Sequence, residues 1–278
     1  MSMTKSLEDV RTFWDAHPLF CGESPYTPGT PDFFDDFRKN YIGDCLAGSL
    51  DDRVLPAGHA RDRGLDLGCG PGFWTVELAR RGCPSIVAAD LSPQSLELAK
   101  RYCAYHKVQA EFRVENAERL SFRDGEFSHV NCQGVIHHTP DTEACVREIA
   151  RVLRPGGTAS LSLYRKNLLL TAWPALSFLG KPLARLGIGL KGRGRETLCE
   201  INDPDEIVRS FDGTGNPIGK CYTRRQIIAL FSPYFAITAM YVHFFPVRMF
   251  PFRVPSSVHR WLDRTMGFLQ YINIKKRP

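Results

Sequence analysis

Residues 64–74 read Gly-Leu-Asp-Leu-Gly-Cys-Gly-Pro-Gly-Phe-Trp, and residues 85–90 read Ser-Ile-Val-Ala-Ala-Asp. The first segment is apolar up to Leu67, as in the end of a buried strand. Glycines at positions 68, 70 and 72 then predict a tight turn, since glycine adopts positive φ values freely. Residues 75–81 have helical spacing of apolar side chains, and residues 85–89 form a second apolar run. The order strand, glycine turn, helix, strand and Asp90 predicts a βαβ unit that binds a ligand with a ribose.

The glycine spacing separates this turn from two other nucleotide-binding turns. A dinucleotide fingerprint needs Gly-x-Gly-x-x-Gly, whereas position 73 is Phe here. No Gly-Lys-Ser/Thr follows, which excludes a phosphate-binding P-loop. Asp66 lies at the end of the first strand, and an acid beside the turn favours a cationic ligand over a pyrophosphate.

The pattern Asp66-x-Gly68-x-Gly70-x-Gly72, with Asp90 closing the second strand, resembles the class I S-adenosylmethionine-dependent methyltransferases. This resemblance implies an α/β fold with a Rossmann-like, doubly wound sheet of seven strands whose last strand is antiparallel. Residues 136–138, Ile-His-His, and residues 151–157, Arg-Val-Leu-Arg-Pro-Gly-Gly, resemble the small-molecule branch of that family. Residues 131–134, Asn-Cys-Gln-Gly, lack the Asn/Asp-Pro-Pro-Tyr/Phe signature of nucleic-acid amino-methyltransferases. A nucleic-acid substrate is therefore not expected.

The resemblance implies S-adenosyl-L-methionine as the cofactor and S-adenosyl-L-homocysteine as the product. Asp66 would anchor the amino-acid end, directly or through water, and Asp90 would accept hydrogen bonds from both ribose hydroxyls through its two oxygens. By analogy, Gln133 faces the methionine end. Asn116 replaces the acid usual in the family, and its carbonyl oxygen can still accept from the adenine amino group. The predicted cofactor-binding residues are Asp66, Gly68, Cys69, Gly70, Gly72, Asp90, Leu91, Asn116, Ala117 and Gln133.

Methyl transfer from a sulfonium depends on alignment and on exclusion of water, and a base helps where the acceptor is a hydroxyl or a protonated amine. His137 and His138 follow the predicted fourth strand, at the carboxyl edge where ligands bind in such sheets. His17 and Tyr164 are further catalytic candidates. Alternatively, one of the paired histidines packs beside the cofactor and the other bonds to the backbone. No His/Cys cluster has metal-ligand spacing, so no metal is predicted.

Composition places the chain among soluble globular proteins. It has 278 residues, of which 43% are hydrophobic and 24% charged. Nine cysteines are scattered without a Cys-x-x-Cys pair and without an export signal, which predicts reduced thiols and a cytoplasmic location. There is no run of 18 apolar residues, so a transmembrane helix is not expected. The sequence does not set the oligomeric state.

Charge is unevenly distributed along the chain. Residues 1–163 hold 18 Lys and Arg against 23 Asp and Glu, a net charge of −5, and residues 164–278 hold 18 against 7, a net charge of +11. The basic part predicts an anionic partner, such as a small-molecule acceptor with an anionic group and an apolar body. The substrate-binding candidates are Trp14, Tyr41, Tyr222 and Arg224, with Arg193, Arg195 and Arg225 as further charge contacts.

Two other functions stay open. The acceptor could be lipid-like or isoprenoid and lie at a membrane surface, which the protein would contact peripherally. The apolar patch for that contact would be Phe244, Phe245, Met249, Phe250 and Phe252, unless these side chains form part of the core. The chain could instead bind an RNA or a protein through its basic half without catalysis, although the intact glycine turn argues against lost cofactor binding.

Four parts are expected along the chain. Residues 1–59 form an N-terminal helical cover, which in the resembled family often folds over the cofactor, and residues 60–164 form the cofactor-binding core. Residues 165–219 form an inserted cap, and residues 220–278 complete the core, with an insertion near 246–265. Helices are predicted over residues 6–14, 32–41, 92–102, 142–153, 223–231 and 256–265, with one or two more within 168–190. Asp32 is predicted to cap the second of these helices. Residues 202–204 and 212–217 are predicted as turns. Further strands are predicted over residues 110–114, 127–134, 158–163, 234–245 and 268–275, with a sharp turn at 154–157. The cover and the cap are expected to set substrate choice.

Overall fold

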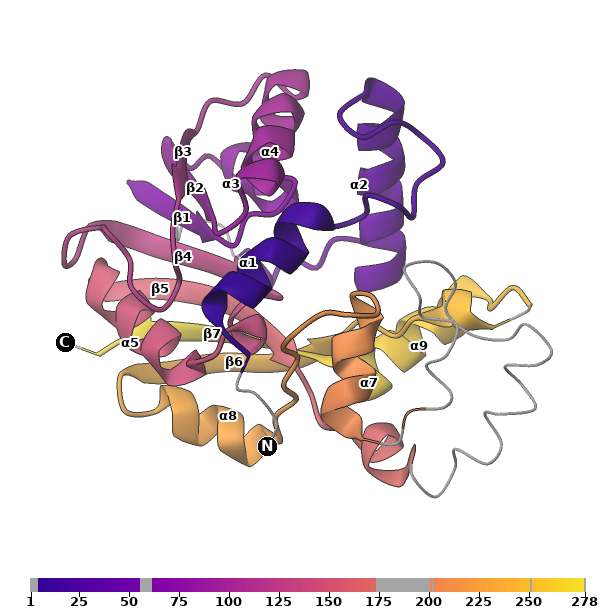
Figure 1. Cartoon of the computed structure of the whole chain (residues 1–278). Coiled ribbons are helices and arrows are strands. Elements are labelled where there is room, and N and C mark those ends of the chain that lie inside the picture. Colours follow the sequence, from indigo (N-terminus) through magenta and orange to yellow (C-terminus); the bar gives the residue numbers. More distant parts are fainter. Residues whose placement is uncertain (1–4, 56–61, 174–200, 202, 251, 278) are drawn as a thin grey trace.

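The computed structural model describes residues 5–55, 62–173, 201, 203–250 and 252–277 (Figure 1). Most of the predicted cap, including Arg193 and Arg195, lies outside the described residues. The strands are β1 (Arg63–Leu67), β2 (Ser85–Asp90), β3 (Glu111–Val114), β4 (Phe127–Gln133), β5 (Leu153–Tyr164), β6 (Phe235–His243) and β7 (Leu269–Lys276). The α-helices are α1 (Leu7–Ala16), α2 (Pro31–Cys45), α3 (Phe73–Arg80), α4 (Pro93–Tyr105), α5 (Thr142–Val152), α7 (Pro204–Phe211), α8 (Arg224–Phe231) and α9 (Ser256–Met266). Short 3₁₀ helices are η1 (Ile136–His138) and η3 (Val247–Met249).

One seven-stranded sheet forms the centre of the molecule, in the order β3-β2-β1-β4-β5-β7-β6. Strands β1 to β5 pair in parallel, and β7 lies antiparallel between β5 and β6. This confirms the predicted doubly wound α/β sheet with an antiparallel last strand. The direction of winding reverses between β1 and β4, and in such sheets ligands bind outside the carboxyl ends of the strands at this point.

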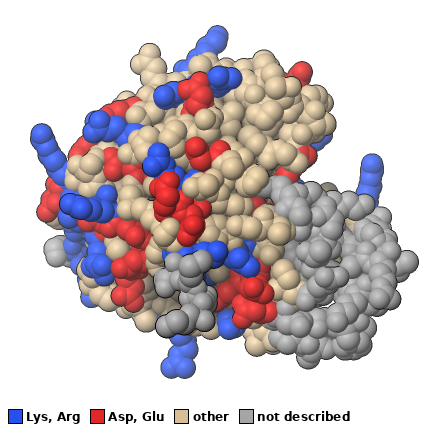
Figure 2. Space-filling view, viewed as in Figure 1, with Lys and Arg blue, Asp and Glu red and all other residues tan. Residues whose placement is uncertain are grey.

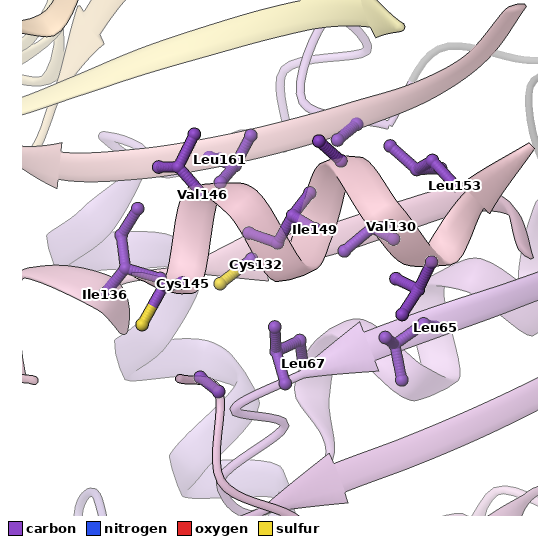
Figure 3. Packing of buried hydrophobic residues seen from close by; sticks show 14 of the residues in the cluster. Leu65, Leu67, Val130, Cys132, Ile136, Cys145, Val146, Ile149, Leu153 and Leu161 are labelled. Atoms are coloured by element: carbon purple, nitrogen blue, oxygen red, sulfur yellow. The ribbon is translucent and has the colours of Figure 1, made fainter. Parts of the chain in front are cut away.

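Alternate residues of the parallel strands face the two helical layers. Leu65, Leu67, Val87 and Ala89 belong to a cluster with side chains of α5 and α8, whereas Ile86 packs with α2, α3 and α4. Figure 3 shows side chains of α5, such as Val146 and Ile149, lying across the strands of this cluster. Both faces of the parallel strands are therefore buried, which explains their nearly continuous apolar sequence.

Several helices begin where their side chains predict. Ser6 and Thr223 each form a capping box with the residue three positions later, and Ser92 caps α4 ahead of Pro93. The prediction that Asp32 caps the second helix is wrong. Thr30 caps α2 because Pro31 takes the first helical position, and the Thr30 hydroxyl accepts from the backbone N–H of Phe33.

The predicted turn at residues 154–157 is also wrong. These residues lie within β5, whose register with β4 shifts between the pairs Phe127–Leu153 and His129–Thr158. The extra residues on β5 form an irregularity in the strand, and Gly156 adopts a φ of +72° there. The run Arg-Pro-Gly-Gly was read as a strand boundary although it is accommodated inside the strand.

Helix α7 was not predicted. The Asp203 side chain accepts from the backbone N–H groups of Asp205 and Glu206, and Pro204 takes the first helical position. These are ordinary helix-start signals, but the cluster around Pro204 was interpreted only as a turn.

Helices α7 and α9 lie near the carboxyl end of β5 (Figure 1). They share a third apolar cluster with Tyr164, Phe244 and Phe268. On the face shown in Figure 2, basic and acidic side chains are mixed rather than gathered in one basic patch. Among the helices of the described residues, none is both long and apolar enough to cross a bilayer.

Candidate active site

The glycine turn between β1 and α3 forms one wall of a cavity. Gly68 has a φ of +71°, and a Cβ there would lie 2.2 Å from Cγ2 of Val135, so only glycine fits. Gly70 has a φ of +51°, lines the cavity, and would place a Cβ with no neighbour within 4 Å. The missing side chain at Gly70 therefore leaves room for a ligand to approach the backbone.

Asp90 closes β2 beside this turn and lines the same cavity. One carboxylate oxygen accepts from the backbone N–H of Gly70 at 2.8 Å, and the other accepts from that of Ser92 at 2.9 Å. Burial raises the pKa of Asp90, while these hydrogen bonds act in the opposite direction. Each oxygen retains a lone pair, so the carboxylate can accept two further donors from a ligand.

Leu91, Asn116 and Ala117 also line the cavity, next to Asp90 in the fold. The side-chain oxygen of Asn116 accepts from the backbone N–H of Glu118 at 2.9 Å, which fixes the orientation of the amide. A carbonyl oxygen has two lone pairs, so one remains for a ligand donor.

Asp66 is buried and does not belong to the cavity lining. Its carboxylate accepts from the Thr75 hydroxyl at 2.6 Å and from the amide nitrogen of Asn131 at 2.8 Å. Burial raises the pKa of Asp66 to about 6. Asp66 was predicted to anchor the ligand either directly or through water. In the structure its carboxylate accepts from two protein donors, and it does not line the cavity.

The Asp66 carboxylate orients Gln133 through Asn131. Because a carboxylate only accepts, Asn131 must turn its NH₂ toward Asp66 and its oxygen toward Gln133, whose Nε2 donates to it at 3.0 Å. The Gln133 Nε2 also donates to the carbonyl oxygen of Ser160 at 3.1 Å. The buried Oε1 of Gln133 has no hydrogen-bond partner among the described residues, although Gln133 lines the cavity. A ligand donor, such as an ammonium group, fits this acceptor.

His137, on η1, also lines the cavity. It is 1% exposed, and its Nδ1 is buried without a hydrogen-bond partner in the part of the chain that the structure describes. Burial lowers the pKa of His137 well below its usual value, and the neighbouring His138 and Lys220 add to this effect. The ring is therefore neutral and has an unused nitrogen, the state that a general base requires.

His138 has both ring nitrogens engaged. Nδ1 lies 2.6 Å from the carbonyl oxygen of Ile218, and Nε2 lies 3.1 Å from a carboxylate oxygen of Asp212. The same oxygen of Asp212 accepts from the Tyr164 hydroxyl at 2.8 Å. Neither nitrogen of His138 is left to take a proton from a substrate, so Asp212 holds His138 and Tyr164 as a fixed wall of the cavity.

Helix α1 covers the cavity, with Leu7, Val10 and Trp14 in its lining. The Trp14 ring contacts the His138 ring edge-on, with centroids 5.4 Å apart. Asp15 accepts from the Ser92 hydroxyl at 2.9 Å and from the backbone N–H of Gln94 at 3.0 Å, which attaches α1 to the start of α4 (Figure 1). The N-terminal helix is therefore anchored beside the position where β2 ends.

The lining residues that come from the C-terminal part of the sequence are mostly apolar and include Phe211, Phe244 and Leu269. Arg248 is the only lysine or arginine among the described residues that line the cavity. Its guanidinium lies 2.8 Å from a Glu23 oxygen and 3.1 Å from an Asp44 oxygen, and both acids also belong to the lining. The positive charge of Arg248 is thus balanced inside the protein.

The cavity brings together most of the predicted site residues. They are Trp14, Tyr41, Gly68, Gly70, Asp90, Leu91, Asn116, Ala117, Gln133, His137, His138 and Tyr164. Sequence reasoning missed Asp212, Glu23, Asp44 and Arg248, which come from segments outside the recognised motifs. Of these, only Asp212 had a local signal, since it begins a noted turn cluster.

Other predicted residues lie elsewhere. Cys69 and Gly72 belong to the turn but not to the cavity lining, and the Cys69 side chain packs with Leu96 and Ala99. His17 is exposed and outside the lining. The Tyr222 hydroxyl donates to the Thr142 hydroxyl at 2.9 Å, and Arg224 lines a separate groove. Neither Tyr222 nor Arg224 lines this cavity, so the substrate contacts that were predicted for them are not formed there.

Comparison with known proteins agrees with this geometry. The family model described as a methyltransferase domain matches residues 65–161, from β1 to β5. The ubiquinone biosynthesis O-methyltransferase of Xanthomonas oryzae pv. oryzae is 38% identical over 106 residues, which cover 38% of this chain and 44% of that protein. The enzyme of the same name from Xanthomonas axonopodis pv. citri is 37% identical over 116 residues, 41% of this chain and 47% of that protein. The chain thus spans less than half the length of these curated relatives.

Solved structures share the fold. A SAM-dependent methyltransferase from Methanosarcina mazei has a TM-score of 0.55 at 22% identity and covers 82% of this chain and 98% of its own. A S-adenosylmethionine-dependent methyltransferase from Mesorhizobium loti has a TM-score of 0.53 at 18% identity, covering 80% of this chain and 94% of its own. At such identities the likeness concerns the fold alone.

The burial of Asp66 predicts a pH-dependent contribution to stability. Its folded pKa of about 6 lies above the value near ~3.9 of an unfolded aspartate, so the folded state binds more protons between the two. The contribution is therefore greatest below both values and is lost as the pH rises through about 6. Between about pH 4 and pH 7, we expect this group to lower the free energy of unfolding by up to about 3 kcal/mol.

Urea denaturation of the wild type and of Asp66→Asn at each pH measures this contribution, because the variant lacks the titrating carboxyl. The unfolding free energy of the wild type should fall relative to that of the variant as the pH rises. A difference that stays constant over the range would contradict a buried, titrating Asp66.

Proposed function

We propose that this chain, which carries a class I S-adenosylmethionine-dependent methyltransferase domain, transfers a methyl group from S-adenosylmethionine to a small-molecule acceptor. The product from the cofactor is S-adenosylhomocysteine. The observation that supports this most directly is a single cavity with two kinds of wall. Gly70, Asp90 and Gln133 line one part of it, and the neutral His137 lines another.

The cofactor-binding part of the cavity suits three portions of S-adenosylmethionine, namely the ribose, the adenine and the ammonium group. Asp90 has two acceptor positions left for the ribose hydroxyls, and Leu91, Asn116 and Ala117 provide the adenine site. The buried, unpartnered Oε1 of Gln133 would accept from the ammonium group. Asp66 acts at one remove in this proposal, by orienting Asn131 and through it Gln133.

When bound, S-adenosylmethionine supplies an electrophilic methyl group that is displaced in line by the acceptor. His137 would take the acceptor proton on a ring nitrogen, since its ring is neutral and Nδ1 is unused. Trp14 on α1 and the Tyr164–Asp212–His138 contacts enclose the reaction and keep water out.

The acceptor that we propose has an apolar body, because Phe211, Phe244 and Leu269 line its part of the cavity. The anionic group predicted from the basic sequence has weak support, since Arg224 lies outside the cavity and Arg248 is paired with Glu23 and Asp44. A neutral acceptor with a hydroxyl nucleophile fits the lining better. The name O-methyltransferase, printed for the relatives from Xanthomonas, also favours oxygen as the accepting atom.

We further propose the division of the chain expected from its sequence. Residues 60–164 and 220–278 contain the strands of the core, while the cover and cap contribute Trp14, Phe211 and Asp212 to the cavity. Acceptor choice would then reside in the segments 1–59 and 165–219. A cytoplasmic location remains part of this proposal, supported by the eight free cysteines of the described residues.

Asp90→Ala should weaken binding of S-adenosylmethionine by roughly 30- to 1,000-fold, since two hydrogen bonds to a carboxylate are lost. Isothermal titration calorimetry measures the affinity. Glu143→Ala is the matched control, because Glu143 is exposed on α5 and outside the cavity lining, and it should bind as the wild type does. Equal affinities for Asp90→Ala and the wild type would remove Asp90 from the ribose site.

Asn131→Ala should weaken S-adenosylmethionine binding about tenfold although Asn131 does not line the cavity. The reason is that Gln133 loses the acceptor that fixes its amide orientation. Ser128→Ala, another buried polar residue of β4, is the control and should lose stability without losing affinity, since among the described residues the Ser128 hydroxyl bonds only to backbone atoms of Arg63. If both variants lost affinity equally, the orientation of Gln133 would not be the cause.

His137→Gln should lower kcat by about 100-fold or more while leaving S-adenosylmethionine affinity unchanged. His17→Gln, at an exposed position outside the cavity, should retain wild-type kcat. Because the pKa of His137 is well below its usual value, the wild-type rate should not fall between about pH 8 and pH 6 through protonation of this residue. A methyl-transfer assay over this pH range with a phenolic acceptor tests both points, and an unchanged kcat in His137→Gln would exclude it as the base.

A further inference from the structure

Helix α9 presents two different faces. His259 and Asp263 are buried, and Leu262 and Met266 pack with the apolar cluster that contains Phe268. The opposite face of the helix is uncovered, where Trp261 is 60% exposed and Val258 is 44% exposed. Phe252, shortly before the helix, is 64% exposed. Three of the eight exposed large apolar side chains of the described residues thus fall within ten positions of the sequence.

Arginines flank these apolar side chains. Arg260 and Arg264 are exposed on the outer side of α9, one helical turn apart, and Arg253 follows Phe252. Arg260 and Arg264 also line an open groove together with Arg165 and Arg224. Within the described part of the chain, none of these arginines has a carboxylate within ion-pair distance.

The three acids in the same groove each have a partner. Asp51 pairs with Arg53 and lies 3.0 Å from Nε2 of His243, Asp52 lies 3.0 Å from a guanidinium nitrogen of Arg81, and Asp263 contacts Nδ1 of His243. Asp263 also accepts from the backbone N–H of Phe244 at 2.7 Å. Five arginines and three aspartates line the groove, so its net charge is positive and its complement is an anion.

We propose that α9 and the preceding Phe252 dock the protein on a bilayer that contains anionic phospholipids. Trp261, Val258 and Phe252 would enter the headgroup region, where amphipathic aromatic side chains are favoured, and Arg260 and Arg264 would meet lipid phosphates. A soluble phosphate would satisfy the arginines but leave the adjacent apolar side chains in water, so the combination favours a lipid surface.

The docked helix would lie beside the acceptor end of the cavity. Leu262 and Met266 of α9 share an apolar cluster with Phe244, which lines the cavity. This consequence rests on the function proposed above: an apolar acceptor dissolved in the bilayer would reach the cavity without crossing water. Membrane docking itself does not depend on catalysis and can be tested separately.

Sedimentation with vesicles tests the proposal on the full chain without cofactor or acceptor. The protein should bind vesicles of equal parts phosphatidylcholine and phosphatidylglycerol, not vesicles of phosphatidylcholine alone, and binding should weaken as salt is raised. Arg260→Ala with Arg264→Ala should lower the partition coefficient by roughly 30-fold, and Trp261→Ala should lower it several-fold.

The matched control is Lys100→Ala with Arg101→Ala on α4, which removes the same charge from exposed positions elsewhere. It should bind nearly as well as the wild type. Thermal melting and S-adenosylmethionine titration show that each variant is folded, since none of these residues lines the cavity.

Four results would overturn the proposal. The first is a wild type that remains in the supernatant with the mixed vesicles, and the second is a control that loses as much binding as the α9 variants, which would indicate net charge alone. Saturable binding of inorganic phosphate or glycerol phosphate without vesicle binding would indicate a soluble anion site. A dimer seen by light scattering that Trp261→Ala dissociates, again without vesicle binding, would assign the face to a second copy. Failure of the proposed methyl transfer would appear only in the activity assay.

Discussion

A buried carboxylate between two parallel strands is the constraint on which the cofactor side of this protein depends. Asp66 of β1 and Asn131 of β4 are register partners, so the pairing of the strands places their side chains together. Burying a carboxylate is costly unless donors surround it, and Thr75 and Asn131 supply them. Since the carboxylate can only accept, it fixes the Asn131 amide and through it Gln133. The strand register therefore fixes the direction in which the Oε1 of Gln133 is presented at the cavity wall.

The opposite side of the cavity depends on contacts between segments that are far apart in the chain. Asp212, just after α7, meets both Tyr164 at the end of β5 and His138 on η1. Arg248 joins Glu23 and Asp44, which come from the N-terminal part. These pairings leave an apolar lining in which His137 stays neutral. Two acids flank the single arginine, so no unpaired positive charge is left among the described residues of the lining, which supports the proposed uncharged acceptor over an anion.

The segment that the family model matches and the segments outside it divide along the same line. The matched residues 65–161 contain the glycine turn, Asp90, Gln133 and both histidines of η1. Trp14, Asp212, Arg248 and helix α9 fall outside them. A shared core with separate additions is common among α/β folds, because loops and added helices can change without disturbing the strand order. In the docking that we propose, the basic half of the chain acts on the surface around α9 rather than inside the cavity.

The sequence by itself determined the core and the cofactor wall. Glycines at 68 and 70 and the acid at 90 are local requirements of one βαβ unit, and the caps at Ser6, Ser92 and Thr223 act within a few residues. Such short-range constraints are visible in a single chain. Errors arose where local signals compete: Thr30 prevailed over Asp32 because Pro31 starts α2, and a Pro-Gly-Gly run was absorbed inside β5. Only the tertiary structure decided that Asp66 faces Asn131 rather than a ligand, that Asp212 holds His138, and that Tyr222 and Arg224 lie away from the cavity. These outcomes depend on side chains that meet across 48 to 80 positions of sequence, and no local pattern encodes which of many distant polar groups will satisfy a buried one.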